Sequence, residues 1–218
     1  MVISINGNNL QRVSSTKFLG VMLDDKLNWK KHIECIAGKV ARTTAILHKS
    51  RCVLSTESLL MVYYGLIYPV IAYCCEIWGN TYKSRVKPIV MLQKRCIRII
   101  GKVDRLESTN PLFSRYNVLK FNDIVRITTL LIAHKRLYGV LPMSIQDCVV
   151  RISHRYESLR KNRFLARFSS TTLGSQSLVS VGTKLWNSIP SVITSIVNHQ
   201  RFKLSIKKFY IQQYTVQV

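Results

Sequence analysis

The segment from residue 86 to residue 103 carries the strongest periodic pattern in the sequence. At about 100° per residue around a helix axis, its apolar side chains fill one half of the circle and its basic side chains gather opposite. The apolar half contains Val86, Ile89, Val90, Leu92, Cys96, Ile97, Ile99, Ile100 and Val103. The basic side contains Lys87, Lys94, Arg95, Arg98 and Lys102, here called the cationic ridge, and continues to Arg105. The pattern predicts a helix that packs on one face and exposes the ridge on the other.

The excess of basic residues extends beyond this helix. The 218 residues include 33 Lys and Arg against 10 Asp and Glu, a formal net charge of +23, and no acidic residue follows Glu157. Metal-dependent phosphoryl transfer and glycoside hydrolysis need converging carboxylates, so this composition disfavours both chemistries. With 47% hydrophobic residues the chain should still fold. Its self-repulsion favours a polyanionic partner.

The cationic ridge has two interpretations. A charged face on one helix is usually only a solvated surface. Few acids balance this ridge, however, with Asp104 and Glu107 at its end, and the whole chain shares the imbalance. We therefore take the five ridge residues as the candidate nucleic-acid-binding site.

The first residues alternate apolar and polar side chains around the turn-rich residues 6–9. Short strands are expected at 2–5, 10–13 and 18–23, as a small β-hairpin. From residue 28 to residue 49 the period becomes helical, and Asp24, Asp25 and Asn28 are suitable caps for that helix.

Further helices follow from the same reasoning. They are expected from the Ser55/Thr56 cap signal to Gly79, with interruptions at Gly65 and Pro69, then at 86–103, 122–138 and 198–213, whereas 151–184 is expected to be loop with short strands. The fold class is mainly α with a small N-terminal β-hairpin. We expect a residual hairpin at 1–25, a helical thumb-like domain at 26–142 and a looser, basic C-terminal subdomain at 143–218. Trp29, Ile33, Leu66, Ile97 and Trp186 should be buried.

The run from Leu59 to Cys75 has no charged residue, which raises the alternative of a membrane-associated helical protein. Tyrosines lie throughout the run rather than at its two ends, so a buried helix pair explains it better and no membrane partner is expected. No secretory signal is visible at the N-terminus, and the six cysteines have no even spacing. We expect an intracellular protein, nuclear or cytoplasmic and not secreted, without a disulfide framework.

Two constellations could hold metals. Asp24 and Asp25 follow an apolar run, but a two-metal site needs a third carboxylate and no acid precedes Asp24, so helix capping is the better interpretation. His32, Cys35, His48 and Cys52 have spacing close to that of a zinc site, but in one helix the two pairs would project apart. Nucleotide-binding loops and nucleophile elbows have no matching string. We therefore expect no catalytic residue, no metal and no cofactor, and no enzyme activity in the isolated chain.

Several short strings, taken in order, resemble the non-LTR (LINE-type, jockey-like) retrotransposon reverse transcriptases, in the region after the catalytic palm. The strings are Phe18-Leu19-Gly20-Val21 with Leu23-Asp24 and Trp29, Tyr68-Pro69-Val70-Ile71, Ile77-Trp78-Gly79, Leu92-Gln93-Lys94-Arg95, Pro111-Leu112-Phe113, Leu119-Lys120-Phe121, Leu141-Pro142 and Leu185-Trp186-Asn187-Ser188-Ile189-Pro190. Each string alone is weak, but together they cover nearly the whole chain in the family's order.

The resemblance implies the C-terminal portion of an RNA-directed DNA polymerase, with the last palm strands, a helical thumb and the region beyond. The family's Tyr/Phe-Ala-Asp-Asp motif belongs upstream of Phe18 and is absent from this sequence. By position, Lys17, Phe18, Leu19 and Gly20 match the hairpin that steadies the primer end, and the ridge helix matches the thumb. The implied partners are an RNA or RNA/DNA template–primer duplex and the rest of a reverse transcriptase. A decayed element remnant without selected activity is the remaining alternative, and the sequence does not define an oligomeric state.

Overall fold

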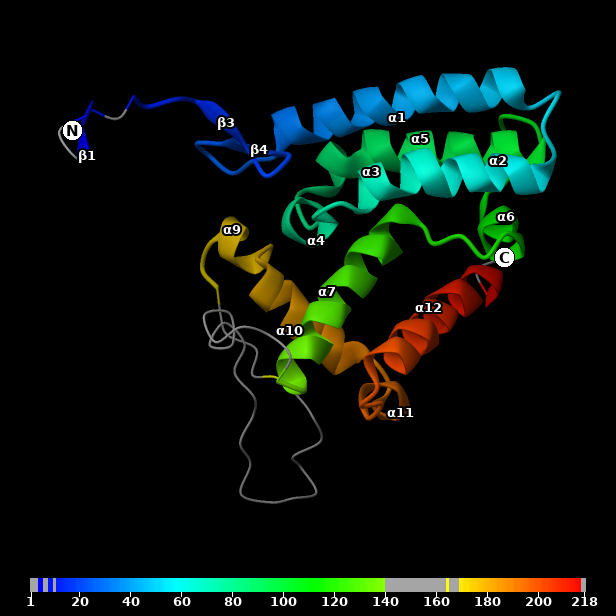
Figure 1. Ribbon diagram of the computed structural model, residues 1–218. Coiled ribbons are helices and arrows are strands. Elements are labelled where there is room, and N and C mark those ends of the chain that lie inside the picture. Colours follow the sequence, from blue (N-terminus) through cyan, green and yellow to red (C-terminus); the bar gives the residue numbers. More distant parts are fainter. Residues whose placement is uncertain (1–3, 6–7, 10, 140–163, 165–168, 217–218) are drawn as a thin grey trace.

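The computed structural model describes residues 4–5, 8–9, 11–139, 164 and 169–216, and Figure 1 shows their arrangement. The chain is mainly helical, with two short antiparallel hairpins at its N-terminus, which confirms the predicted fold class. The strands are β1 Ser4–Ile5, β2 Asn8–Asn9, β3 Ser15–Phe18 and β4 Val21–Asp24. The helices are α1 Lys30–Ser50, α2 Thr56–Val62, the π-helical turn η1 Tyr63–Ile67, α3 Tyr68–Ala72, α4 Cys75–Trp78, α5 Lys83–Gly101, α6 Asn110–Arg115, α7 Phe121–Leu137, α9 Thr172–Ser175, α10 Leu178–Ser188, α11 Ser191–Thr194 and α12 His199–Val216.

The N-terminal strands differ from their predicted positions: residues 11–13 of the strand predicted at 10–13 form no strand, and β3 lies at Ser15–Phe18 instead. β1 pairs with β2, and β3 pairs with β4 so that Phe18 lies opposite Val21. The predicted strand at 18–23 is therefore wrong at its start, because Leu19 and Gly20 form the turn with φ values of 46° and 83°. Two consecutive residues with positive φ give the turn type that best matches the twist of a tight hairpin.

Two side chains organise the turn that leads into α1. The Asp24 carboxylate accepts hydrogen bonds from the backbone N–H groups of Lys26, Asn28 and Trp29 at 2.9 to 3.2 Å. The Asn28 side chain accepts one from Lys30 at 3.2 Å. Asn28 thus satisfies the N–H of the first helical residue, as predicted, whereas Asp24 holds the turn before the helix and does not cap its first turn. Asp25 instead lies 4.0 Å from Arg12 at the surface.

The uncharged segment 59–75 folds back along α1 as α2, η1 and α3 (Figure 1). The Ser55 side chain caps α2 by accepting a hydrogen bond from the Ser58 N–H group. The interruptions predicted at Gly65 and Pro69 correspond to the π-helical turn and the start of α3. The extra residue of a π turn rotates the helix faces. Leu66 is therefore 52% exposed, so its predicted burial is wrong. Within the described residues, no helix is both long enough and apolar enough to span a bilayer.

Helices α1 and α5 lie side by side and run in the same direction (Figure 1). The Arg85 side chain donates to the Asn28 carbonyl at one end, and the Thr44 hydroxyl lies 3.1 Å from the Cys96 sulfur further along. The packed faces are the predicted ones, and Ile33 and Ile97 are both buried. The five described cysteines are free thiols.

Trp78 joins this helical layer to the rest of the molecule. Its ring stacks on Phe121 with centroids 5.5 Å apart, and the edge of His32 meets it at 5.2 Å. The indole N–H donates a 3.0 Å hydrogen bond to the Tyr73 carbonyl. Trp78 is completely buried, so its ring fills space between the two layers.

The second layer contains α7, α10 and α12, and both α10 and α12 pack against α7. Its core includes Trp186, His134 and Phe202, whose rings lie 4.3 to 6.3 Å apart between centroids. Helices at 122–138 and 198–213 were predicted and correspond to α7 and α12. Trp29 and Trp186 are buried as predicted. The division of the chain at residue 143 stays a prediction.

The prediction of loop and short strands over 151–184 is wrong for its described helical part, where α9 and α10 form. The small polar residues there cap and pack helices. The Ser177 side chain accepts a hydrogen bond from the Ser180 N–H group at the start of α10. Gly182 is buried against Thr129 of α7, where a Cβ would stand 3.4 Å away in ordinary van der Waals contact. The rest of 140–168, apart from Phe164, lies outside the described residues.

Candidate nucleic-acid interface

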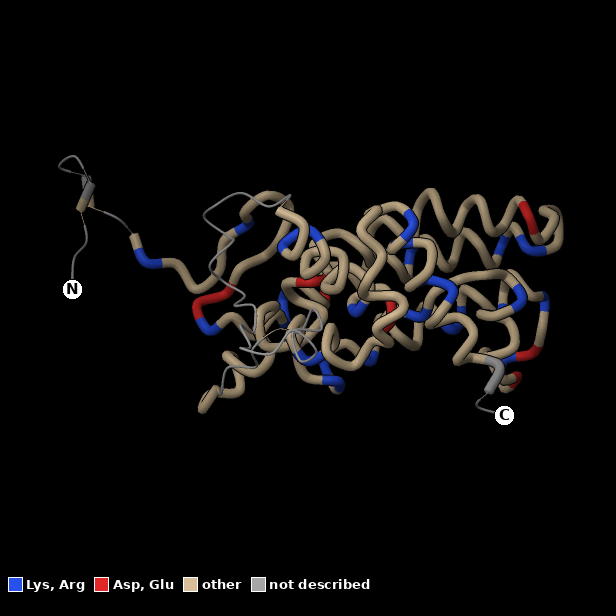
Figure 2. The backbone as a smooth tube through the Cα atoms, turned by 90° about the horizontal axis from the view of Figure 1, so that it is seen from below, with Lys and Arg blue, Asp and Glu red and all other residues tan. Residues whose placement is uncertain are grey.

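The described chain carries basic residues on most helices and few acidic ones, as Figure 2 shows. Helix α5 places all five ridge residues at the surface. Lys87, Arg95 and Lys102 are exposed, and Lys94 and Arg98 are half-buried. Gln93, which lies within the same turn as Lys94, points inward instead and is buried.

The C-terminal end of α5 is fixed by its own ridge residues. Lys102 caps the helix in the left-handed conformation with φ 55°, and its N–H group donates to the Ile99 carbonyl at 3.1 Å. The Arg98 side chain donates a 2.7 Å hydrogen bond to the Glu107 carbonyl. Arg98 therefore holds the loop after α5 as well as carrying a charge.

A basic groove of about 670 Å³ lies between the end of α1, the second half of α5 and the loop that follows α5. Its apolar lining consists of Met91, Leu92, Ile99, Val103 and Leu106. Its cationic residues, here called the groove arginines, are Arg51, Arg95, Arg98 and Arg105, and His48 joins them. None of the described residues that line it is acidic. The groove therefore presents several guanidinium groups to one space without a neutralising carboxylate.

The contribution of α1 to this groove does not follow from the sequence pattern. His48 and Arg51 lie at the end of α1, and only the packing of α1 beside α5 brings them to Arg95 and Arg98. A helical wheel places residues on one helix and says nothing about which helix lies next to it. The available signal was the group of basic residues at the end of the first long helix, His48, Lys49 and Arg51.

Lys94 does not line the groove and lies near a second cationic residue, Lys120. Burial lowers the pKa of Lys120; Asp123 opposes this effect, and Lys94 lowers the pKa further. The Lys120 ammonium group lies 4.0 Å from the ring centroid of Tyr214, as in a cation–π interaction. The ridge therefore spreads over two directions, with Lys94 near α7 and the arginines near α1.

The nearby acid Asp123 is engaged in structural contacts. One oxygen of its carboxylate accepts a 2.6 Å hydrogen bond from the Tyr214 hydroxyl, and the other lies 2.9 Å from Arg126. The backbone N–H of Lys120 donates to the same Tyr214 hydroxyl at 3.1 Å. Burial and the Asp123 charge raise the pKa of Tyr214, so the phenol remains the donor. This network fixes α12 to the start of α7.

The predicted primer-end hairpin, Lys17, Phe18, Leu19 and Gly20, is exposed at the opposite end of α1. Phe18 is 61% and Leu19 73% exposed. The Tyr73 hydroxyl donates a 2.7 Å hydrogen bond to the Leu19 carbonyl, which supports the turn from the helical layer. Helix α1 is about 30 Å long, so the structure does not bring the hairpin next to the groove.

The two constellations weighed as metal sites have other roles. Burial acts to raise the pKa of Asp24, but three backbone N–H groups that donate to its carboxylate outweigh this and hold the pKa below its usual value. His32 is buried, and its Nδ1 accepts a hydrogen bond from the Met22 N–H group at 3.3 Å. Among the residues that the structure describes, no three His, Cys, Asp or Glu side chains converge on a common point suited to a metal ion.

Comparison with known proteins connects this basic helical architecture to mobile genetic elements. The chain is 35% identical over 91 residues to the probable RNA-directed DNA polymerase from transposon X-element of Drosophila melanogaster. It is 27% identical over 125 residues to the RNA-directed DNA polymerase from mobile element jockey of the same species. The chain resembles part of a jockey-type RNA-directed DNA polymerase. A jockey enzyme from Drosophila funebris is similar at 26% identity over 127 residues.

The alignments with these jockey-type polymerases cover 40% to 57% of this chain but 10% to 14% of the curated proteins. They therefore identify a polymerase-related segment, which confirms the resemblance read from the sequence strings. No family model matches the chain, and no solved structure matches it.

Proposed function

We propose that this chain grips an RNA or RNA/DNA template–primer duplex as part of a jockey-type reverse transcriptase, through contacts to backbone phosphates and without catalytic aspartates of its own. The observation that carries the proposal is the basic groove, where the groove arginines and His48 converge with no acid lining. The formal charge of +23 and the ridge lysines extend this cationic surface.

Arginine suits this role because its planar guanidinium group can donate two hydrogen bonds to one phosphate. The apolar side chains that line the groove can pack against sugar carbons between neighbouring phosphates. Phosphate and sugar contacts carry no base information. Binding should therefore tolerate any duplex sequence and weaken steeply as salt rises.

The hairpin tip supports a further part of the proposal, that Phe18 and Leu19 contact the primer end. Both side chains are exposed although they are large and apolar, and Leu19 has a left-handed backbone that costs about 1 kcal/mol or more for an L residue. Exposed apolar residues held in a strained turn are typical of a contact surface.

The test measures affinity for a duplex against salt concentration with three sets of variants. Lys87, Lys94 and Lys102 are replaced together by Gln; Arg51 and Arg95 are replaced together by Gln; and the exposed Lys30, Lys39 and Lys184, which do not line the groove, are replaced by Gln as the control. Arg98 is kept because it holds the loop after α5. Each lost phosphate contact lowers the slope of log affinity against log salt by about 0.7 to 0.9.

We expect the slope to fall by about 2 in the ridge variant and by about 1.5 in the groove variant. The control should keep the slope of the unmodified chain, and thermal unfolding should be unchanged in all three. If both test variants retain their affinity and slope, the ridge and groove are solvated surfaces. The acid-free stretch after Glu157 would then be the better candidate.

A further inference from the structure

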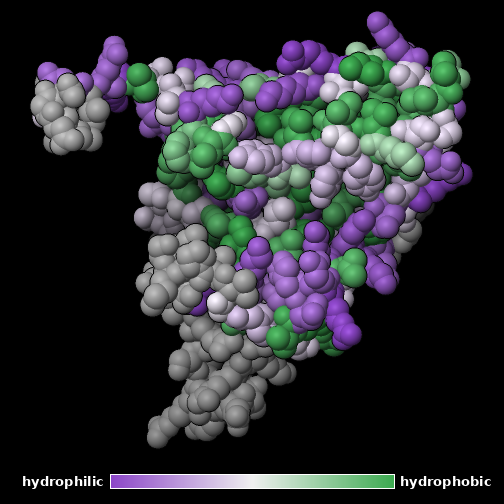
Figure 3. Space-filling view, in the orientation of Figure 1, coloured by the Kyte–Doolittle hydropathy of each residue, from purple (hydrophilic) through white to green (hydrophobic). Residues whose placement is uncertain are grey.

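A second pocket, separate from the basic groove, lies between η1 and α3 of the first layer and α7 and α12 of the second. It has a volume of about 270 Å³. Four elements line it: η1 and α3 contribute one tyrosine each, α7 contributes aliphatic side chains, and α12 contributes lysines. Its lining includes Tyr64, Tyr68, Ile127, Leu131, Lys203 and Lys207. Figure 3 shows the change from pale and apolar side chains over α2 and α3 to hydrophilic ones over α12.

The two tyrosines offer aromatic surface to this pocket. The rings of Tyr64 and Tyr68 lie 5.6 Å apart at 54°, and Tyr64 is 40% exposed. Tyr63 meets Tyr64 edge-on from the buried side at 5.3 Å. Both residues lie in the π-helical turn η1, where Tyr63 is buried and Tyr64 is partly exposed. Such turns occur frequently at functional sites.

The two lysines give the pocket an unbalanced positive charge. Lys203 and Lys207 are four residues apart and therefore share one face of α12. Burial lowers the pKa of Lys207, and Lys203 lowers it further. Neither ammonium group has a carboxylate partner among the described residues, and no acid follows Glu157 in the sequence.

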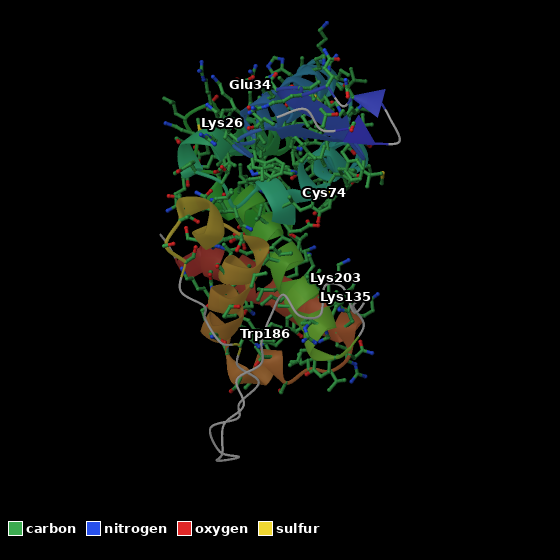
Figure 4. All side chains as sticks on the ribbon, turned by 90° about the vertical axis from the view of Figure 1, so that its left-hand side faces the viewer. Lys26, Glu34, Cys74, Lys135, Trp186 and Lys203 are labelled. Atoms are coloured by element: carbon green, nitrogen blue, oxygen red, sulfur yellow. The ribbon has the colours of Figure 1, made fainter. Side chains whose placement is uncertain are left out.

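The surroundings of Lys203 are also cationic. Figure 4 shows Lys203 of α12 near Lys135 of α7, and His199 lies close to both. Burial lowers the pKa of His199, and His134, Lys135 and Lys203 lower it further. The edge of the pocket therefore repels cations and attracts an anion.

We infer that this pocket binds one unpaired nucleotide of a single-stranded nucleic acid, with the base against the tyrosines and its phosphate on Lys203 and Lys207. Aromatic faces accept any base by stacking, and lysines beside them follow the backbone. The pocket is too small for a duplex, so its occupant differs from that of the basic groove. The inference takes one element from the proposed function, namely that the partner is a nucleic acid.

The test uses fluorescence anisotropy with a short oligothymidylate and with an abasic oligonucleotide of equal length. Tyr64→Leu removes the aromatic face but keeps apolar bulk, and Tyr64→Phe keeps the face. Lys203 and Lys207 are replaced together by Gln. Lys208→Gln on the same helix is the charge control, because Lys208 does not line the pocket. Thermal melts establish that every variant is folded.

Tyr64→Leu should weaken oligothymidylate binding about 5-fold to 100-fold, as expected for loss of one base–aromatic stack, and should leave abasic binding unchanged. Tyr64→Phe should stay close to the unmodified chain. The double lysine variant should weaken both probes, and Lys208→Gln should have a much smaller effect. Equal affinities for Tyr64→Leu and Tyr64→Phe, or equal losses on both probes, would overturn the inference.

The same variants separate this inference from the proposed function. The groove and ridge variants should lose duplex affinity while the effect of Tyr64→Leu on oligothymidylate persists. If duplex binding proves insensitive to the ridge and groove but Tyr64→Leu still discriminates the two probes, the proposed grip is wrong and the nucleotide pocket stands. The reverse result would reject the pocket alone.

Discussion

The hydroxyl of Tyr73 supports the backbone of Leu19, 54 residues earlier in the chain, through a hydrogen bond of 2.7 Å. The Tyr73 ring also lies 3.4 Å from where a Cβ would stand on Gly20. The exposed turn of the hairpin is thus held by a side chain that follows α3. The position of Phe18 and Leu19 therefore depends on the helical layer as well as on pairing between β3 and β4.

Tyr73→Phe should loosen this turn without unfolding the chain, because it removes the hydrogen bond and keeps the ring beside Gly20. We expect faster amide hydrogen exchange at Gly20 and Val21, with unchanged exchange in α1 and α5. Tyr82→Phe is the matched control, since Tyr82 is a surface tyrosine whose hydroxyl does not contact the hairpin. Equal exchange in both variants would show that strand pairing alone orders the turn.

Gln93 should contribute strongly to stability. Its amide donates to the Tyr63 hydroxyl at 2.8 Å and to the Leu119 carbonyl at 2.9 Å, and its oxygen accepts from the Phe121 N–H group at 2.7 Å. Gln93→Leu leaves these buried groups without a partner, so the free energy of unfolding should fall by about 3 kcal/mol. Urea unfolding measures this. A loss below about 1 kcal/mol would indicate that other donors and acceptors replace the amide.

Trp29 and Leu66 form a pair that tests the burial described here. Trp29 is 8% exposed, so Trp29→Ala should lower the free energy of unfolding by about 3 to 5 kcal/mol. Leu66 is 52% exposed, so Leu66→Ala should change it by about 0.5 kcal/mol or less. Urea melts of the two variants should differ accordingly. Similar losses of unfolding free energy in the two variants would mean that Leu66 of the π-helical turn is buried rather than exposed.

Stability should fall as the pH drops below about 6.5, the ordinary pKa of histidine. Burial lowers the pKa of His134, although its hydrogen bond to the Ile196 carbonyl opposes this. The unfolded chain therefore binds more protons than the folded chain in that range, and unfolding is favoured. His134→Gln should flatten the dependence measured by thermal melts between pH 7 and pH 5. Part of the pH dependence should remain in this variant, because the pKa values of His32 and His199 are also lowered.

The isolated chain should not extend a primer on an RNA template with dNTPs and Mg²⁺. Asp24 is engaged by backbone N–H groups, and Asp25 lies at the surface near Arg12. Extension that is detected and then lost in the Asp24→Asn, Asp25→Asn double variant would show that these aspartates have a catalytic role. Asp25→Asn alone should behave like the unmodified chain in unfolding experiments.

The sequence predicted the helices whose apolar faces repeat regularly, because burial of one face follows directly from the period. It also placed the ridge at the surface for the same reason. It could not predict the basic groove, since Arg51 and Arg95 meet only through the packing of α1 beside α5. It likewise missed α10, whose cap and contact with α7 use small residues that are also typical of loops.

The contact between Lys120 and Tyr214 spans 94 residues and has consequences for how the chain folds during synthesis. Helices α6 and α7 leave the ribosome long before α12, which later packs against both of them. Until α12 has been made, Phe113 of α6 and the carboxylate of Asp123 lack the partner that Tyr214 provides. Closing so long a loop is entropically costly and slow. During this interval the surfaces of α6 and α7 that α12 later covers are exposed, and exposed apolar surface makes a folding chain prone to aggregation.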